Sequence, residues 1–135
     1  MMQSHMNTFT RIFTAAPEHI DELGHVNNAV WVQWLQDLSV AHWQAAADPV
    51  HVDAFFWVIV RHEIDYRGNI GLGEQATGRT WVPGTPRGAR FARHAAFADA
   101  RGRDIVTAIS TWAMLDKATG RPARVTADIV AAFQD

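Results

Sequence analysis

The chain has 135 residues, which is the size of one ordinary domain and excludes a second full domain. Apolar residues make up 48% and charged residues 19%, a composition that excludes a disordered or fibrous protein. The formal net charge of -2 provides no positive field, so neither nucleic acid nor an anionic membrane surface is expected as a partner. The absence of cysteine excludes disulfides, thiolate metal sites and a cysteine nucleophile.

The N-terminus gives no sign of a targeting segment. It has neither a positive start nor a long apolar stretch, so a secretory signal is not expected, and no apolar run reaches the roughly 18 residues that span a bilayer. We interpret residues 1–5 as a cloning remnant or disordered start, because Ser4-His5-Met6 is typical of a cloning junction, and residues 6–135 as a single domain. The cytoplasm is the default compartment for such a chain.

A short strand and a long helix come first along the chain. Residues 8–14 alternate in the manner of a strand. Asn27 or Asn28 can then cap a helix, because an asparagine side chain accepts hydrogen bonds from the free N–H groups of the first turn. The helix is predicted to stop by Asp48-Pro49, since proline disfavours helical geometry in the preceding residue. Its apolar face has the spacing of an amphipathic helix and consists of Trp31, Trp34, Leu35, Leu38 and His42.

After residue 49 the hydrophobic period changes from 3.6 to 2, which predicts strands. The first, residues 55–66, is apolar on both faces at its start, with Phe55, Trp57 and Ile59 on one face. Three further strands are predicted at residues 74–82, 90–99 and 104–116, the last two joined as a hairpin. A short segment at residues 127–133 is predicted as a last strand.

One helix ahead of four long antiparallel strands is an α+β pattern. The apolar helix face needs a cover, and only a sheet is available. We therefore predict a curved antiparallel sheet wrapped around one long central helix. The opposite sheet face and the edges then stay open, with Phe55-Trp57-Ile59 on one of them. A homo-oligomer, either a homodimer or a homotetramer, is expected from edge pairing or face packing.

The segment richest in chemistry is residues 21–28, which places a carboxylate and an imidazole in the loop that leads into the helix. A helix N-terminus offers unpaired N–H groups and the positive end of the dipole, which suit a developing oxyanion. A carboxylate in the same loop can act as general base or nucleophile. The loop therefore carries the parts that acyl transfer needs.

The motif Asp21-x-x-Gly24-His25-Val26-Asn27-Asn28 is followed by an aromatic residue three positions on and by an acid nine positions after the second asparagine. This pattern resembles the hotdog-fold acyl-CoA thioesterases of the 4-hydroxybenzoyl-CoA thioesterase-like group, with acyl-carrier-protein thioesterases as cousins. The ending at residues 115–122 is also similar to that family. The resemblance covers nearly the whole chain and implies hydrolysis of an acyl-CoA, with CoA as part of the substrate and no other cofactor.

The resemblance also implies roles for single residues. Asp21 takes the position of the catalytic aspartate, as base towards water or as nucleophile on the thioester carbonyl. The backbone N–H of Asn28 takes the oxyanion-donor position. His25 matches a histidine that is catalytic in the carrier-protein thioesterases, and Asp37 matches a helix glutamate that helps to activate water in some relatives.

The chain departs from the family pattern at several positions. His19 stands where many relatives have a second acid, Trp31 replaces a usual tyrosine, and Asp37 is one methylene shorter than glutamate. Leu23 stands where the carrier-protein enzymes place an asparagine of their catalytic network, which favours CoA over a carrier protein. A carrier-protein thioesterase and a non-catalytic acyl-CoA-binding module remain the alternatives.

Thioester hydrolysis needs little more than this loop supplies. The leaving thiol has a pKa of about 8.5 and departs as thiolate near neutral pH, so one base and one oxyanion site suffice. A metal is not expected, because the spacing of His19, Asp21 and His25 matches no common metal site. Arg87, Arg90 and Arg93 follow a turn and are candidates for CoA phosphate contacts, with ordinary surface arginines as the alternative.

Overall fold

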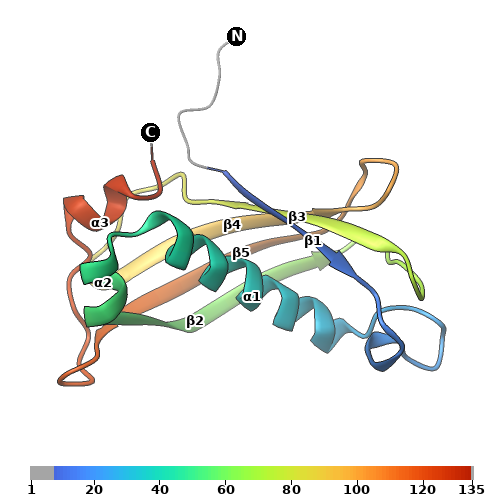
Figure 1. Cartoon of the computed structure of the whole chain (residues 1–135), viewed down its shortest axis with the longest axis horizontal. Helices are drawn as coiled ribbons and strands as arrows, with labels where there is room; N and C mark the ends of the chain where they lie inside the picture. The colour runs from blue at the N-terminus through green and yellow to red at the C-terminus, as the bar shows by residue number, and fades with distance from the viewer. Residues whose placement is uncertain (1–7, 135) are drawn as a thin grey trace, which may run out of the picture.

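The computed structural model describes residues 8–134, which form one curved antiparallel sheet against one long helix (Figure 1). The sheet order is β1-β3-β4-β5-β2, and every neighbouring pair is antiparallel. The predicted α+β architecture is therefore confirmed. The strands are β1 (Phe9–Thr14), β2 (Phe55–Tyr66), β3 (Gln75–Trp81), β4 (Arg90–Ala98) and β5 (Asp104–Asp116). The helical elements are η1 (Pro17–His19), α1 (Asn28–Ala46), α2 (Pro49–Ala54) and α3 (Ala127–Ala131).

Hydrophobic alternation locates the strands closely. The predicted strands at residues 55–66 and 104–116 coincide with β2 and β5, and the other three differ by a residue or so at their ends. The helix also begins and ends where predicted, with Asn27 as its N-cap and Ala47 as its C-cap. Residues 1–5, interpreted above as a cloning remnant, lie outside the described residues. No helix in residues 8–134 is long and apolar enough to cross a membrane.

Two short helices differ from the sequence prediction. Residues 127–133 were predicted as a strand, and this prediction is wrong, because residues 127–131 form α3. The physical reason is the four-residue spacing of Ile129 and Phe133, both 1% exposed, which turns both side chains to one side of a helical turn. The helix α2 was not predicted, although Asp48 caps it through its side chain and Pro49 starts it.

The faces of β2 differ from those predicted, because the strand contains a β-bulge. The register against β5 shifts between Ile59 and Arg61, so that Val60 is an extra residue and the strand changes faces there. Phe55 and Trp57 pack against the core, and the open side carries Phe56, Val58 and Val60 instead. The segment Phe55-Trp57-Ile59 thus lies on an edge strand, as one of the predicted alternatives had it, but the side chains of Phe55 and Trp57 do not face the open side.

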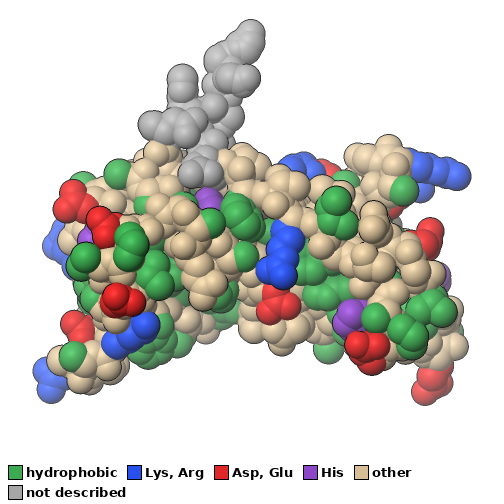
Figure 2. Space-filling model, in the orientation of Figure 1, with side chains coloured by type: hydrophobic (Ala, Val, Ile, Leu, Met, Phe, Trp, Pro, Cys, Tyr) green, Lys and Arg blue, Asp and Glu red, His purple; other side chains and the backbone are tan. Residues whose placement is uncertain are grey.

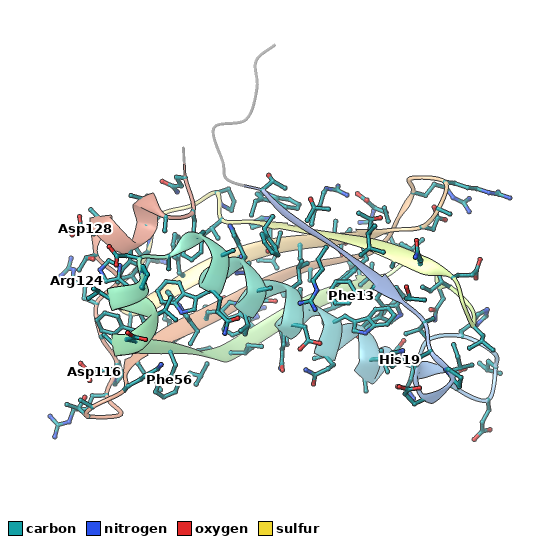
Figure 3. All side chains as sticks on the ribbon, viewed as in Figure 1. Phe13, His19, Phe56, Asp116, Arg124 and Asp128 are labelled. Atoms are coloured by element: carbon teal, nitrogen blue, oxygen red, sulfur yellow. The ribbon has the colours of Figure 1, made fainter. Side chains whose placement is uncertain are left out.

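The helix α1 has a different set of neighbours at each end. Around its first half, Trp31, Trp34 and Leu38 pack with side chains of the sheet, and Trp34 stacks on Phe13 with ring centroids 5.3 Å apart. Around its second half, Trp43 packs with residues of β2, α3 and the segment that precedes α3. Figure 3 shows His19 beside the start of α1 and Phe56 near its opposite end. The core thus divides into two clusters, one at each end of the helix.

His42 is a fully buried polar group between these clusters. Its ring stacks on Phe9 with centroids 5.3 Å apart and meets Phe133 edge-on at 5.1 Å. Its Nδ1 accepts a hydrogen bond from Arg93 Nη1 at 2.8 Å. Burial and the nearby Arg93 charge lower the pKa of His42 from 6.5 to about 3, so the ring is neutral near pH 7.

The depressed pKa of His42 makes stability depend on pH. Between pH 6.5 and about 3 the unfolded chain binds a proton at His42 and the folded chain does not, so the free energy of unfolding falls as pH falls. We predict that His42→Asn, which keeps an acceptor but does not titrate, has a shallower fall of the thermal midpoint between pH 7 and pH 4. Parallel profiles for the two proteins would contradict this, even if the variant is less stable throughout.

Candidate active site

The loop between β1 and α1 is closed into a defined shape. Ile20 and Val26 form an isolated antiparallel bridge, and the Asp21 N–H donates to the His25 carbonyl at 2.8 Å. Gly24 has a φ of +79°, a left-handed conformation that a side chain would strain. The loop therefore returns on itself and delivers the chain to the first turn of α1.

The carboxylate of Asp21 is held by the backbone of its own loop. One oxygen, Oδ1, accepts the N–H groups of Leu23 at 2.9 Å and His25 at 3.2 Å. The other oxygen, Oδ2, has no hydrogen-bond partner among the described residues, and the residue is only half-buried. Two backbone bonds thus orient the carboxylate while one oxygen stays open to a reactant.

The start of α1 presents a free N–H next to this carboxylate loop. The Asn27 side chain accepts from the Ala29 N–H at 2.9 Å, and the Asn27 carbonyl accepts from Val30 and Trp31. No partner for the N–H of Asn28, the first residue of the helix, is found in residues 8–134. An exposed first-turn N–H at the positive end of the helix dipole is suited to bind an oxyanion.

Asn69 ties the loop and the helix together, and the sequence analysis missed it. Its amide donates to the Val26 carbonyl at 3.0 Å, and its oxygen accepts from Trp31 Nε1 at 3.3 Å and from the Ile70 N–H at 2.8 Å. Asn69 is 38 residues from Trp31 along the chain, and a Gly-Asn pair after a strand indicates only a turn. No sequence signal distinguishes this asparagine from an ordinary turn residue.

Tyr66 is a second polar group at the helix start that sequence reasoning missed. Its hydroxyl, at the end of β2, donates to the Asn28 carbonyl at 3.4 Å. Partial burial raises the pKa of Tyr66 above its ordinary value of 10, so the phenol stays protonated and can donate near neutral pH.

The two loop histidines have different surroundings. His19 is half-buried, accepts from the Ala16 N–H through Nδ1 at 2.9 Å, and packs edge-on against Trp34. His25 is exposed, and its backbone rather than its ring makes the contacts with Asp21. No group of three or more His, Asp or Glu side chains in the described part of the chain is arranged to hold a metal ion.

Asp37 lies apart from the loop within this chain. It follows Asn28 by nine residues, about 14 Å along the helix axis, and its Oδ1 accepts from Gln33 Nε2 at 2.9 Å. The structure therefore joins Asp21 and His25 by hydrogen bonds in the loop that leads to Asn28, and it leaves Asp37 on the flank of the helix.

The three arginines considered for CoA do not share a surface. Arg87 and Arg90 are exposed and form a backbone bridge with each other at the start of β4. Arg93 is 8% exposed and points into the interior, where it contacts His42. Contact with CoA phosphates stays a prediction for Arg87 and Arg90. Arg93 is buried and does not lie on the surface that Arg87 and Arg90 occupy.

Fold and loop together define a hotdog-fold thioesterase domain. The model of the family described as the acyl-ACP thioesterase N-terminal domain matches residues 6–133, and the chain belongs to this family. No curated protein matches the chain significantly in sequence.

Solved structures support the same assignment. An acyl-ACP thioesterase from Bacteroides thetaiotaomicron is 26% identical, with a TM-score of 0.81 over 96% of this chain and 54% of its own. A thioesterase from Thermus thermophilus complexed with coenzyme A and Zn is 22% identical, with a TM-score of 0.78 over 92% of this chain and 95% of its own. A predicted thioesterase from Bacillus stearothermophilus is 21% identical, with a TM-score of 0.81 over 93% of each chain. The chain thus spans about half of the Bacteroides protein, and the other two likenesses show the hotdog fold.

The role of Asn69 can be tested by stability. We predict that Asn69→Ala lowers the free energy of unfolding by about 1–3 kcal/mol, because the Val26 carbonyl and the Trp31 indole N–H lose their partner. Gln75→Ala removes an exposed side-chain hydrogen bond to Thr14 and is the matched control, with an expected change within about 0.5 kcal/mol. Urea unfolding measures both, and equal effects would contradict the anchoring role.

Proposed function

We propose that the protein hydrolyses an acyl-CoA thioester to the free acid and CoA, with Asp21 as general base or nucleophile. The observation that carries the proposal is that one short segment holds both a backbone-oriented carboxylate and a helix N–H with no partner among residues 8–134. The thioesterase family of the chain supports the hydrolytic reaction. The presence of coenzyme A in the Thermus thermophilus thioesterase complex supports CoA as the thiol.

The geometry suits a simple hydrolytic sequence. The thioester oxygen accepts the Asn28 N–H, which stabilises the negative charge that develops as the carbonyl carbon becomes tetrahedral. In the general-base route, Asp21 Oδ2 takes a proton from water while the water oxygen bonds to that carbon. The C–S bond then breaks, the thiol leaves as thiolate, and the acid product keeps the new C–O bond. No acid of high strength is needed for this leaving group.

The other polar groups near the loop assist the proposed reaction without attacking the thioester. The exposed imidazole of His25 lies on the same loop and is available to hold water or to exchange a proton with it. The Tyr66 hydroxyl holds the Asn28 carbonyl, which steadies the peptide next to the oxyanion donor. Asp37 lies on the flank of α1, bonded to Gln33, and has no part in the hydrolysis proposed at this loop within one chain.

An acyl carrier protein is the second candidate for the thiol carrier. The family match and the 26% identical Bacteroides thetaiotaomicron acyl-ACP thioesterase favour it. The same loop would perform the same chemistry, since both carriers present an acyl thioester. A non-catalytic acyl-CoA-binding module is the third candidate and differs by releasing no thiol.

Asp21→Asn tests the reaction and the residue together. We predict that kcat/KM for thiol release falls by roughly 100-fold or more, because the amide cannot accept the proton. Glu22→Gln, a change at the exposed neighbouring carboxylate, is the matched control and should keep activity. The assay compares short, medium, long and aromatic acyl-CoAs with acyl carrier protein thioesters. Full activity of Asp21→Asn would contradict the role assigned to Asp21. Binding of acyl-CoA to the wild type without thiol release would favour the non-catalytic acyl-CoA-binding module.

We also propose that the protein forms a homodimer through β2, with a homotetramer as the alternative. This strand is 12 residues long and lies at one edge of the sheet, so its outer backbone groups are unpaired within the chain. Its exposed side chains include Phe56, Val58 and Val60, which are 38%, 37% and 43% exposed. Figure 2 shows hydrophobic surface over α2 and the first part of β2.

Light scattering tests this interface. We predict that Val58→Glu shifts the protein to the monomer mass, because a buried unpaired carboxylate opposes association. Ile12→Glu makes the same kind of change on β1, the other edge strand, where Ile12 is 58% exposed, and should keep the dimer. If Ile12→Glu dissociates the protein and Val58→Glu does not, the wrong edge has been assigned.

A further inference from the structure

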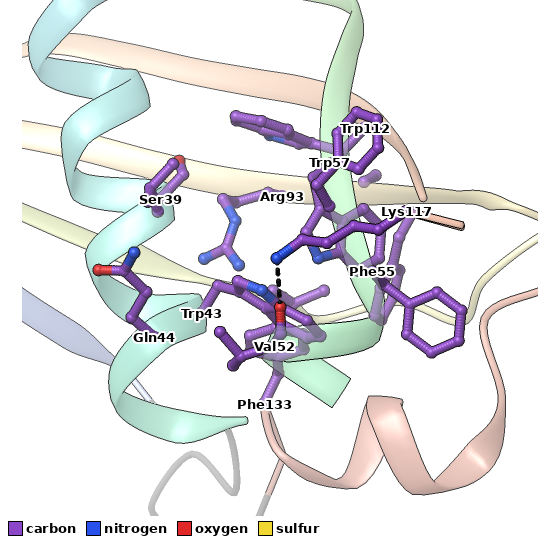
Figure 4. Close-up of a pocket in the computed structure, with 15 residues that line it drawn as sticks. Ser39, Trp43, Gln44, Val52, Phe55, Trp57, Arg93, Trp112, Lys117 and Phe133 are labelled. Atoms are coloured by element: carbon purple, nitrogen blue, oxygen red, sulfur yellow. Dashed lines mark hydrogen bonds between the residues drawn. The ribbon is translucent and has the colours of Figure 1, made fainter. Parts of the chain in front are cut away.

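A concave site lies at the end of α1 remote from the Asp21 loop. It is a cavity of about 200 Å³ between the last turns of α1, helix α2, and strands β2 and β4 (Figure 4). The α1 residues that line it, from Ser39 to Gln44, follow Asn28 by roughly 17–24 Å along the helix axis. Its wall is mostly apolar, and the aromatic part of it consists of Trp43, Phe55, Phe56, Trp57, Phe91, Trp112 and Phe133.

A buried arginine reaches into this cavity. Arg93 is 8% exposed, and its Nη1 donates to His42 Nδ1 at 2.8 Å and to Thr80 Oγ1 at 3.1 Å. Its guanidinium carbon lies 5.0 Å from the centroid of the Phe133 ring. Figure 4 shows the guanidinium directed between Ser39 and Trp43, into the space that the aromatic residues surround. Nη1 thus ties β4 to α1 and β3, and the opposite side of the group faces the cavity.

The guanidinium has no acidic partner in the part of the chain that the structure describes. None of the ion pairs of residues 8–134 includes Arg93, and the residues that line the cavity contain no Asp or Glu. Its Nε and Nη2 carry no hydrogen bond to any described residue. Both Arg93 contacts through Nη1 are to neutral acceptors, since His42 is uncharged near neutral pH.

An unpaired cation in an apolar interior is costly unless an anion accompanies it. Burial lowers the pKa of Arg93 to about 9, and no carboxylate among the described residues opposes that shift, yet the group stays charged near pH 7. A second cation, Lys117, borders the cavity, and its Nζ donates to the Val52 carbonyl at 2.9 Å and to no other group of residues 8–134. Among the described residues, the cavity lining therefore combines mostly apolar side chains with two cations and no anion.

We propose that this cavity binds a small carboxylate with a compact apolar body. The carboxylate oxygens accept from Arg93 Nε and Nη2, the side-on arrangement that a guanidinium fork favours, and the body lies among the aromatic rings. An apolar cavity of about 150 Å³ accommodates a benzene molecule, so about 200 Å³ suits one ring or a chain of about six carbons. A nucleotide is too large and too polar for these walls.

Calorimetry with paired probes tests the charge requirement. Benzoate and hexanoate are compared with benzamide and hexanamide, which have the same body and no charge. We predict that each carboxylate binds roughly tenfold or more tightly than its amide, because hydrogen bonds to a charged group contribute about 1.5–3 kcal/mol. Equal binding of acid and amide, or no binding of either acid at millimolar concentration, would overturn the proposal.

Variants locate the binding. Arg93→Gln should abolish the preference for carboxylate, and Arg101→Gln, the same change at an exposed arginine of the β4–β5 hairpin, should leave it intact. Val52→Phe fills the cavity without changing Arg93, so it should abolish binding of both acids even if Arg93→Gln does not fold. Unchanged binding in Val52→Phe would contradict the proposal.

The site is independent of the proposed hydrolysis. Asp21→Asn should bind benzoate and hexanoate as the wild type does, because Asp21 belongs to the loop at the other end of α1. Loss of carboxylate binding in Asp21→Asn would place the probes in the thioester site instead and would overturn the inference. Failure of thiol release by the wild type would leave these binding results untouched.

Discussion

The capped start of α1 is the constraint on which the candidate active site depends. The Asn27 side chain accepts from the Ala29 N–H, and the Asn27 carbonyl accepts from the next two N–H groups. The Asn28 N–H is therefore the donor of this turn that has no partner among the described residues. The Asp21 loop is built onto the same turn through the Ile20 and Val26 bridge. A shift of the helix along its axis would therefore move both the oxyanion donor and the carboxylate. Packing of α1 against the sheet prevents such a shift, and Asn69 fastens the loop at its exit.

Local patterns made the main elements of the fold predictable. Short stretches of sequence contain the hydrophobic alternation of β2 and β5, the asparagine cap and the proline after α1. Three features were not predictable in this way. The bulge at Val60 depends on pairing with β5, and α3 depends on burial of Ile129 and Phe133 against distant elements. The helix α2 is too short for a periodic signal, although its Asp48 cap and Pro49 are typical of a helix start.

The candidate site divides in the same way. Asp21, His25 and Asn28 belong to one continuous segment, and its motif identified them. Asn69 and Tyr66 reach that segment through the sheet, from 38 or more residues away, and no local pattern marks them. Arg93 was predicted to lie on the surface, because a local pattern of three arginines after a turn is typical of an exposed patch. Strand alternation turns Arg93 inward, beside His42, and leaves a buried charge that no carboxylate of residues 8–134 neutralises.

The most direct test of the account is the structure of a complex with a non-hydrolysable ketone analogue of an acyl-CoA. In such an analogue a methylene replaces the thioester sulfur, so the carbonyl is retained and cannot be cleaved. We predict that its carbonyl oxygen lies within about 3.2 Å of the Asn28 nitrogen and that Asp21 Oδ2 faces the carbonyl carbon. A ketone bound away from the start of α1, with Asp21 unengaged, would contradict the account.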